Sequence, residues 1–587
     1  MVLDGLRQRA ANSGRTRLAI VAVLFLSLTL LLSQPFHFRS SGYFPPTVEA
    51  EELQYPVSSH DGAINQLRPK RIAIVGAGAS GSATAFFLRR AARVMAERIG
   101  VPEEKLVGDI VVFDKEGYIG GRSTTVHPHD DPNLRPVELG ASIFVEANRH
   151  MVKAAKLFNL TLIDPDFGES GVGIWDGEEF LYITSLSKSL FSGWWDALSA
   201  AWRYGPLSPY RTSSAVGAML RKFSNFYNPK WLIKHGAARS IEEFIDRVDL
   251  GRDLTTVKGD EWALKTVGVS EKWMGEIMEG STRVNYASDM DMIHALGASV
   301  SMATGGAKAV QGGNWRIFEA MLKNASATMH LGTTVSQVLN PLYPIEGHDN
   351  FGVTDIRPYL DESGERMFQI VTNISTKDID QPFDNVFFAA PWHSSPLAKD
   401  FTLPLETDIP RQRYVRLHVT YFATTRRRPD PSFFGLPNTT TLPTTILTTG
   451  YTARQSKNRP PPRFQSITWH GETYPGSGEY TVKVFSLTYL KDSIIRSIIG
   501  GDEPTWLLRK EWDSYPPLRP ISSYAPVEPV KGVQYLAALE PWISTMETQT
   551  LSGREAVARV VEEWWGLGMG ECRGGADAWD WSCAKYS

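Results

Sequence analysis

The chain has 587 residues, of which 42% are apolar and 21% charged, and its formal net charge is −3. This length exceeds what one hydrophobic core usually supports, so we expect two interleaved domains. The composition is that of a globular protein without a basic excess, which argues against a nucleic-acid partner.

Residues 1–40 carry a predicted targeting segment, in which an apolar run at Leu18–Leu32 follows four arginines. A basic region before such a run is typical of a secretory signal. The run is short for a membrane span and a small-residue cleavage pattern is poor, so a cleaved signal and a retained anchor both stay open. We expect a lumenal protein of the secretory pathway, bound for a lysosome or vacuole and associated with the membrane through this segment.

Glycosylation sequons and the cysteines fit that placement. The two cysteines, Cys572 and Cys583, lie in the C-terminal tail 566–587, where they form one disulfide or remain two free thiols. The sequons begin at Asn159, Asn324, Asn373 and Asn438.

After a linker at 41–70, residues 71–150 carry a nucleotide-binding pattern. An apolar strand (72–75) passes into an Ala-rich helix through Gly76-x-Gly78-x-x-Gly81, with Ala79 and Ser80 in the first helical turn. This turn brings the backbone against a pyrophosphate. A second strand (110–113) ends in Asp114 and Lys115. An acid at that position accepts hydrogen bonds from ribose hydroxyls, which favours FAD or NAD over a 2′-phosphorylated nucleotide.

The remaining chain alternates between the two expected domains. Residues 151–305 read as a mainly helical insert, 306–395 return to the nucleotide domain with strands at 333–338 and 384–391, and 521–565 complete that domain with a long helix. Residues 396–520 are β-rich, with strands expected at 414–422, 444–449, 464–469 and 480–489. In the insert, Trp194, Trp195, Trp202 and Tyr204 either line an apolar ligand tunnel or belong to an ordinary core.

A second glycine-rich segment, Gly120-Gly121-Arg122, and the sequence ELGAS at 138–142 follow the first motif. Together they resemble flavoproteins of the glutathione-reductase and amine-oxidase type. That resemblance implies a Rossmann-type α/β domain for FAD with an interleaved α+β substrate domain. It also implies that Arg122 and the Gly140-Ala141-Ser142 loop lie along the pyrophosphate and the flavin ring.

The same resemblance assigns residues of the later segments. Met546 and Glu547 begin the last helix, whose N-terminus would face the flavin pyrimidine edge, Glu540 precedes that loop, and Val335 corresponds to a valine beside the adenine. No Cys or His stands where a covalent link would form, so we expect noncovalent FAD. His127 and His129 lack a third ligand at diagnostic spacing, so no metal site is expected.

Several blocks narrow the resemblance to the prenylcysteine oxidase (prenylcysteine lyase) family, above all STRVNYASDMDMIHALGASVSM at 281–302, together with VQGGN, KVFS, KEWDSYPPLRP and STMET. The family implies oxidative cleavage of farnesyl- or geranylgeranyl-cysteine by O2 to cysteine, a prenyl aldehyde and hydrogen peroxide. Arg283, Asn285 and Tyr286 are the candidate catalytic residues.

Alternatives remain at the level of both residue and function. Arg283 or Asn285 would hold the cysteine carboxylate, because a guanidinium fork matches a carboxylate; alternatively Arg283 is a structural ion-pair partner. Another flavin amine oxidase or isoprenoid desaturase, and a noncatalytic flavin-binding protein, are the competing functions.

Overall fold

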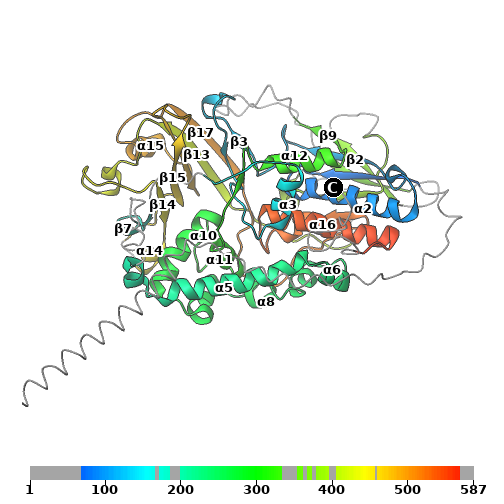
Figure 1. The fold of residues 1–587 in the computed structure, drawn as a ribbon, viewed down its shortest axis with the longest axis horizontal. Coiled ribbons are helices and arrows are strands. Elements are labelled where there is room, and N and C mark those ends of the chain that lie inside the picture. Colours follow the sequence, from blue (N-terminus) through cyan, green and yellow to red (C-terminus); the bar gives the residue numbers. More distant parts are fainter. Residues whose placement is uncertain are drawn as a thin grey trace, which may run out of the picture.

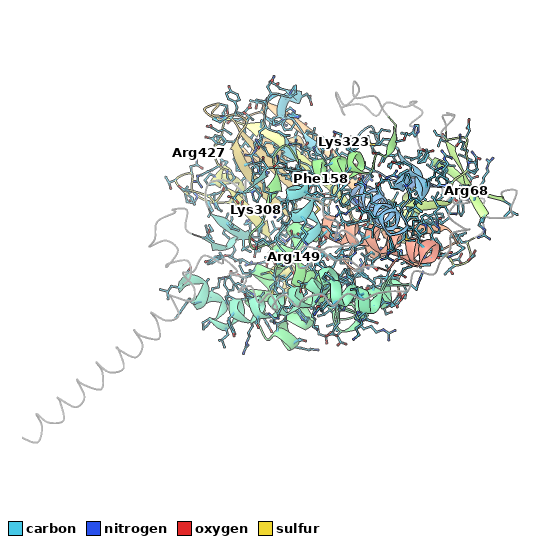
Figure 2. The ribbon with its side chains drawn as sticks, turned by 45° about the vertical axis from the view of Figure 1, so that its right-hand side comes forward. Arg68, Arg149, Phe158, Lys308, Lys323 and Arg427 are labelled. Atoms are coloured by element: carbon cyan, nitrogen blue, oxygen red, sulfur yellow. The ribbon has the colours of Figure 1, made fainter. Side chains whose placement is uncertain are left out.

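The computed structural model describes most of the chain, and Figure 1 draws it as a coloured ribbon. The described residues are 68–165, 171–184, 198–332, 353–360, 366–372, 379–395, 405–456 and 459–568. Two sheets occupy opposite ends of the ribbon, and helices run below both (Figure 1). Figure 2 shows Arg68 beside the first sheet and Arg427 beside the second. The apolar run 18–32 and both cysteines lie outside the described ranges, within which no helix is long and apolar enough to cross a bilayer.

The first sheet is a five-stranded parallel sheet in the order β18-β12-β1-β2-β9. Its strands are β1 (Lys70–Val75), β2 (Val107–Asp114), β9 (Thr328–Leu331), β12 (Asn385–Phe388) and β18 (Val533–Tyr535). Ile72, Ala73 and Ile74 of β1 are fully buried. Ile72 and Ile74 pack with the helices Ala79–Ile99, Trp315–Asn324 and Met546–Trp565, whereas Ala73 belongs to the cluster that contains Ile356 and Phe368 of the strands Val353–Leu360 and Arg366–Thr372. The sheet combines strands from three separated stretches of the chain, and the expected Rossmann-type fold is confirmed.

Four helices pack around this sheet: α2 (Ala79–Ile99), α3 (Arg149–Leu157), α12 (Trp315–Asn324) and α16 (Met546–Trp565). The two longest, α2 and α16, lie directly against each other. A side chain at Gly553 of α16 would lie 2.6 Å from the Ser80 carbonyl oxygen, so a glycine there permits this contact. The packing fixes the N-termini of both helices at the same side of the sheet (Figure 1).

The second sheet has seven strands in the order β17-β13-β16-β15-β14-β6-β7. They are β6 (Val172–Trp175), β7 (Phe180–Ile183), β13 (Arg416–Thr424), β14 (Thr445–Thr448), β15 (Ser466–Glu472), β16 (Tyr480–Ser486) and β17 (Trp506–Asp513). All neighbours are antiparallel except β14 and β6. The four strands expected between 414 and 489 correspond to β13 to β16.

This sheet differs from the sequence expectation in three strands. β6 and β7 come from the segment expected to be mainly helical, and β17 was not foreseen as a strand. A separate hairpin of β10 (Val353–Leu360) and β11 (Arg366–Thr372) was also not foreseen. The strand expected at 333–338, and with it Val335, lies outside the described residues.

A helical layer lies below the two sheets (Figure 1). Its members include α5 (Leu207–Phe223), α6 (Pro229–His235), α7 (Ile241–Asp246), α8 (Arg252–Thr255), α10 (Glu279–Tyr286) and α11 (Ala295–Ser301). A π-helical segment, Trp273–Met278, leads directly into α10. Such segments are often found at functional sites because they shift the register of the side chains that follow.

The aromatic tunnel suggested for the insert is wrong for the two described residues. Trp202 is 92% exposed, and Tyr204 is buried with its hydroxyl donating to Glu276 at 2.9 Å. Neither lines the large cavity of the molecule. Trp194 and Trp195 lie outside the described residues.

Candidate cofactor and substrate site

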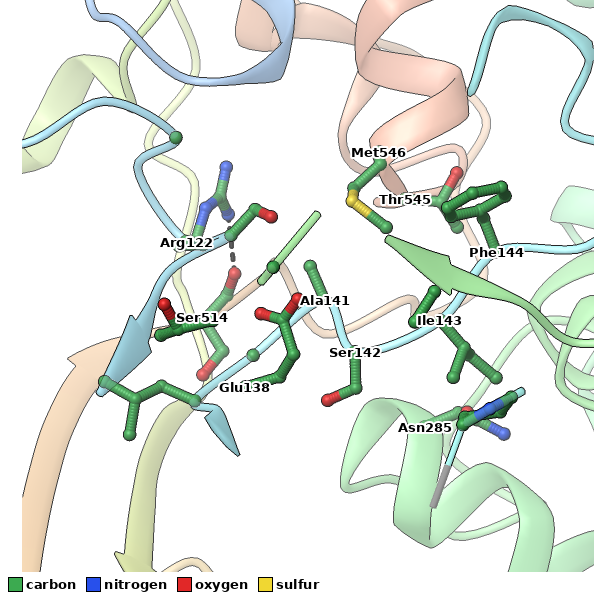
Figure 3. Close-up of a pocket in the computed structure, with 18 of the residues that line it drawn as sticks. Arg122, Glu138, Ala141, Ser142, Ile143, Phe144, Asn285, Ser514, Thr545 and Met546 are labelled. Atoms are coloured by element: carbon green, nitrogen blue, oxygen red, sulfur yellow. Dashed lines mark hydrogen bonds between the residues drawn. The ribbon is translucent and has the colours of Figure 1, made fainter. Parts of the chain in front are cut away.

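A large cavity of about 2290 Å³ lies between the two sheets and above the helical layer. Its wall combines the turn before α2, the end of β2, the loop 138–148, the N-terminus of α16, and residues of α5, α10, α11 and the second sheet. Figure 3 shows Glu138, Ala141 and Ser142 on one side of the cavity and Thr545 and Met546 on the other. The cavity is large enough for a dinucleotide and a second molecule together.

The glycine motif forms one end of this cavity. Gly76, Gly78, Ala79 and Ser80 line it, whereas Gly81 does not. A side chain at Gly81 would lie 1.9 Å from the Gly76 carbonyl oxygen, so this glycine permits close helix–strand packing. The first N–H groups of α2 have no partner within the helix and carry its positive dipole end, which makes this turn suited to a pyrophosphate.

Asp114 lies at the end of β2, and it lines the cavity beside Lys115. Its carboxylate accepts backbone N–H groups from Ala77 at 2.7 Å and Glu116 at 2.9 Å. Burial raises the pKa of Asp114, and these two donors partly oppose that rise. The carboxylate is thus fixed at the position where a ribose hydroxyl would donate to it.

Arg122 and Glu540 form an ion pair. The Arg122 guanidinium also donates a hydrogen bond to the Ser514 carbonyl oxygen at 2.6 Å. Arg122 lines the cavity, while Glu540 lies behind it and is 2% exposed. Glu540 therefore positions the arginine and does not itself face a ligand. Opposite, a side chain at Gly140 would lie 2.8 Å from the Trp512 ring, so glycine allows that indole to approach the loop.

The N-terminus of α16 also opens into the cavity. Thr545 caps the helix by accepting the Thr548 N–H at 3.1 Å, and Thr545 and Met546 line the wall (Figure 3). Because a helix N-terminus carries about half a positive charge, it favours an anion at this place. Met546 lines the cavity wall, and its role beside a flavin stays a prediction.

Glu547 points away from the cavity, contrary to its predicted role in binding the cofactor. Its carboxylate accepts the backbone N–H groups of His150 at 2.8 Å and Met151 at 3.1 Å, and also the Tyr227 hydroxyl. Burial raises the pKa of Glu547 to about 7. The residue joins the start of α3 to the start of α16, because a helix residue next to a cavity-facing one projects to another side.

Lys483 of β16 is a buried amine in the cavity wall, and it is not among the residues predicted from the sequence. Its Nζ donates to the Glu138 carbonyl oxygen at 2.7 Å and to Ser142 Oγ at 3.1 Å. It also lies 5.4 Å from the Tyr421 ring centre and 4.6 Å from that of Phe485. Burial lowers the pKa of Lys483 to about 7. A lysine between two valines is the ordinary pattern of a strand with one solvent-facing side, so no sequence signal marks this residue.

Glu138 also lines the wall, and its two carboxylate oxygens have different environments. One oxygen accepts the Asn314 N–H at 2.7 Å, whereas Oε2 is buried without a hydrogen-bond partner. Burial raises the pKa of Glu138 to about 7. A buried polar atom without a partner points to a missing ligand or water at that position.

Two of the three candidate catalytic residues reach the cavity, and the third does not. Asn285 and Tyr286 line it. The Asn285 amide donates to the Ser281 carbonyl oxygen at 2.9 Å, and the Tyr286 ring packs edge-on against Tyr515 at 5.6 Å. Arg283 lies outside the wall and pairs with Asp289 at 2.6 Å.

The remaining nitrogens of the Arg283 guanidinium are also engaged. They donate to Thr448 Oγ1 at 3.0 Å and to the Gln465 side chain, and Arg283 is 6% exposed. The structure therefore corresponds to the alternative that Arg283 is a structural ion-pair partner. It joins α10 to strand β14 and to the residue that precedes β15.

The residues present fit a dinucleotide with a flavin ring. The glycine turn leaves room at Gly78, where an added Cβ would meet nothing closer than 3.8 Å, and Glu138 and the start of α16 contribute to the cavity wall. The two histidines considered as metal ligands have other partners: His127 contacts the Leu134 carbonyl oxygen and His129 contacts Glu479. Within the described ranges, no three metal-ligating side chains gather at one place.

Comparison with known proteins identifies the family. A family model described as prenylcysteine lyase matches residues 188–569, and one for an NAD(P)-binding Rossmann-like domain matches residues 74–156. The chain belongs to the prenylcysteine lyase family. Its relatives include a farnesylcysteine lyase of Arabidopsis thaliana, 26% identical over 85% of this chain and 89% of the relative. Prenylcysteine oxidase 1 of Mus musculus is 26% identical over 84% of this chain and 90% of the relative.

Solved structures support the fold. One from an Exiguobacterium species, described provisionally as a protoporphyrinogen oxidase, aligns with a TM-score of 0.51 and 13% identity, covering 85% of this chain and 100% of that one. The likeness shows a shared fold, with a Rossmann-type domain and an interleaved second sheet.

Proposed function

We propose that this chain is an FAD-dependent thioether oxidase that cleaves farnesyl- or geranylgeranyl-cysteine. The overall reaction takes the thioether, one water and one O2 to cysteine, a prenyl aldehyde and hydrogen peroxide. The observation that carries the proposal is the family match over residues 188–569, the stretch that supplies five of the seven strands of the second sheet, the helical layer and α16. The names of the relatives support this substrate class.

The chain's own residues would hold FAD noncovalently from end to end. Asp114 accepts from the ribose, the start of α2 faces the pyrophosphate, and the start of α16 faces the flavin ring. When bound, the flavin accepts a hydride from the carbon next to sulfur and passes the electron pair to O2. That carbon is both allylic and bonded to sulfur, so loss of hydride from it needs little help from acids or bases of the protein.

Two wall residues are suited to the proton transfers that follow. Water that adds to the substrate carbon loses a proton, and the departing sulfur gains one. Glu138 Oε2 and Lys483 Nζ are buried groups of the cavity wall whose pKa values lie near 7. Groups that titrate near the working pH accept and return protons most effectively.

The test is anaerobic mixing of the purified protein with farnesylcysteine while the flavin absorbance is followed. The proposal expects bleaching of the flavin, then recovery in air with formation of peroxide and aldehyde. The matched control is the saturated thioether of the same length, which lacks the allylic double bond and should bleach the flavin far more slowly. Bleaching by a polyamine but not by farnesylcysteine contradicts the proposal in favour of an amine oxidase. A yellow protein that no prenylated thiol reduces contradicts it in favour of a noncatalytic protein.

We also propose a lumenal location in the secretory pathway, with membrane attachment through residues 1–40. Among the sequon asparagines, Asn159 and Asn438 are exposed, as an acceptor must be. Removal of N-glycans from protein made in a eukaryotic cell should increase its gel mobility, and replacing both asparagines with glutamine should remove much of that shift. An unglycosylated protein in the cytosolic fraction contradicts the proposal.

A further inference from the structure

One arm of the cavity is lined almost entirely by apolar side chains. It lies between α5 and α11, two helices of the lower layer that contact each other (Figure 1). Its wall consists of Met219, Leu220, Phe223, Leu250, Leu296 and Trp542. By contrast, the wall formed by β14 and β15 carries Thr445, Ser466, Thr468 and His470. The cavity therefore separates an apolar arm from a polar face.

Within this arm we take Phe223, Leu250 and Trp542 as the inner end, because Trp542 contacts both of the other residues. They are 8%, 0% and 1% exposed, so solvent hardly reaches them. The Trp542 indole donates to the Leu250 carbonyl oxygen at 3.1 Å, and its ring stacks with Phe223 at a centroid distance of 6.4 Å. The hydrogen bond and ring contact hold three separate chain segments together, so the end of the arm has a defined position.

The inner end is also tied to the position of the reaction. Ser544 and Thr545 follow Trp542 by two and three positions, and they line the cavity where α16 begins. A substrate whose reacting carbon lies near that helix start can extend its tail toward these apolar side chains. The polar face across the cavity remains available for the charged end of the same substrate.

We propose that the arm binds the isoprenoid tail and that Phe223, Leu250 and Trp542 set the chain length the enzyme prefers. This inference rests on the proposed function and adds the residues that distinguish a farnesyl from a geranylgeranyl tail. A tail that reaches these side chains fills the arm, and a tail one isoprene unit longer must displace them. Because apolar pockets discriminate by about 10–200-fold for each methylene, the effect on a whole isoprene unit is measurable.

The experiment compares kcat/KM for farnesylcysteine and geranylgeranylcysteine in the flavin-loaded full chain. Phe223→Leu lengthens the arm and should raise the geranylgeranyl-to-farnesyl ratio at least about tenfold. Leu250→Phe shortens the arm and should lower the same ratio. Phe318→Leu is the matched control, because Phe318 is fully buried in α12 and lies outside the cavity wall. The ratio is independent of the fraction of each variant that folds, and flavin content is measured alongside.

Opposite shifts of the ratio in Phe223→Leu and Leu250→Phe, with no shift in Phe318→Leu, support the inference. An unchanged ratio in both arm variants, while both thioethers are turned over, overturns it and leaves the proposed function intact. A flavin-loaded wild-type protein that oxidises neither thioether overturns the proposed function, and this inference with it.

Discussion

Replacing Lys483 with methionine tests whether the buried amine of Lys483 lowers the free energy of unfolding of the protein. Methionine has a similar length but no charge. In the variant, Tyr421 still donates to the Glu138 carbonyl oxygen at 2.8 Å, so that acceptor keeps one partner. The exchange therefore removes the buried amine and its two hydrogen bonds with little other change.

The size of the effect follows from the pKa of Lys483. Burial lowers it from 10.5 to about 7, which corresponds to about 4–5 kcal/mol at pH 7 because one unit is about 1.4 kcal/mol. The two lost hydrogen bonds contribute about 1 kcal/mol each in the opposite direction. We expect Lys483→Met to be about 2–3 kcal/mol more stable than the wild type at pH 7, while oxidase activity falls.

The sign of the pH dependence is fixed by proton linkage. Between the folded pKa near 7 and the unfolded pKa near 10.5, the unfolded chain binds more protons, so wild-type stability rises with pH. The advantage of the variant is therefore full at and below pH 7 and is lost as the pH approaches about 10.5. Urea unfolding from about pH 6 to pH 10 measures it, with Lys510→Met of β17 as the control. A variant that is less stable at pH 7, or an advantage that stays constant up to pH 10, refutes the reasoning.

Three further variants test other contacts. Gly81→Ala should greatly weaken flavin retention and lower the unfolding temperature, because its new methyl group meets a carbonyl oxygen at 1.9 Å. Gly305→Ala is the control: its methyl group has no neighbouring atom within 4 Å, so this variant should behave as wild type. Arg122→Met should lower the free energy of unfolding in urea by about 3 kcal/mol, because it leaves the Glu540 carboxylate buried and unpaired. The double variant with Glu540→Gln should recover part of that loss. If the losses of the two single variants simply add in the double variant, the pairing is contradicted. Arg283→Met should lower the unfolding temperature with KM for farnesylcysteine unchanged, and a large rise in KM without loss of stability would instead place Arg283 at the substrate.

The nucleotide end of the site could be predicted because local spacing determines it. Gly76, Gly78 and Gly81 lie within one turn and one helix start, and Asp114 follows from the parallel pairing of β2 with β1. In such a unit, the positions of the backbone groups follow from the sequence separation alone. Gly81 was nevertheless assigned to binding, whereas it serves the packing.

The direction of single side chains near the cavity could not be predicted in the same way. Glu547 follows the cavity-lining Met546 yet caps α3, and Arg283 is two residues from the cavity-lining Asn285 yet pairs with Asp289. On a helix, neighbouring residues project about 100° apart, so membership of a motif does not fix which residue faces a ligand. The partners of Glu547 lie more than 300 residues earlier, and Arg283 combines the nearby Asp289 with the distant Thr448 and Gln465, so spacing in the sequence does not predict either set.

Lys483 illustrates a different limit. Its neighbours Val482 and Val484 are fully buried, so the strand itself was recognised, but the partners that accept from the amine lie in the loop 138–142, more than 300 residues earlier. Only the packing of the second sheet on the nucleotide domain brings the two segments together. Because a lysine between two valines also fits an ordinary strand with one face in solvent, only this packing shows that the amine is buried.

Polar groups lie at one end of the cavity and apolar side chains at the other, which suits the cavity to a dinucleotide and an apolar substrate at the same time. Asp114 and the start of α2 provide the polar groups at the nucleotide end, whereas the arm that ends at Phe223 and Trp542 offers none apart from an indole N–H already bonded to a carbonyl. A phosphate cannot enter the arm without losing its hydrogen bonds, and an isoprenoid gains nothing at the nucleotide end. Under the proposed function, the two ligands would occupy opposite ends of the cavity and meet near Thr545, where α16 begins.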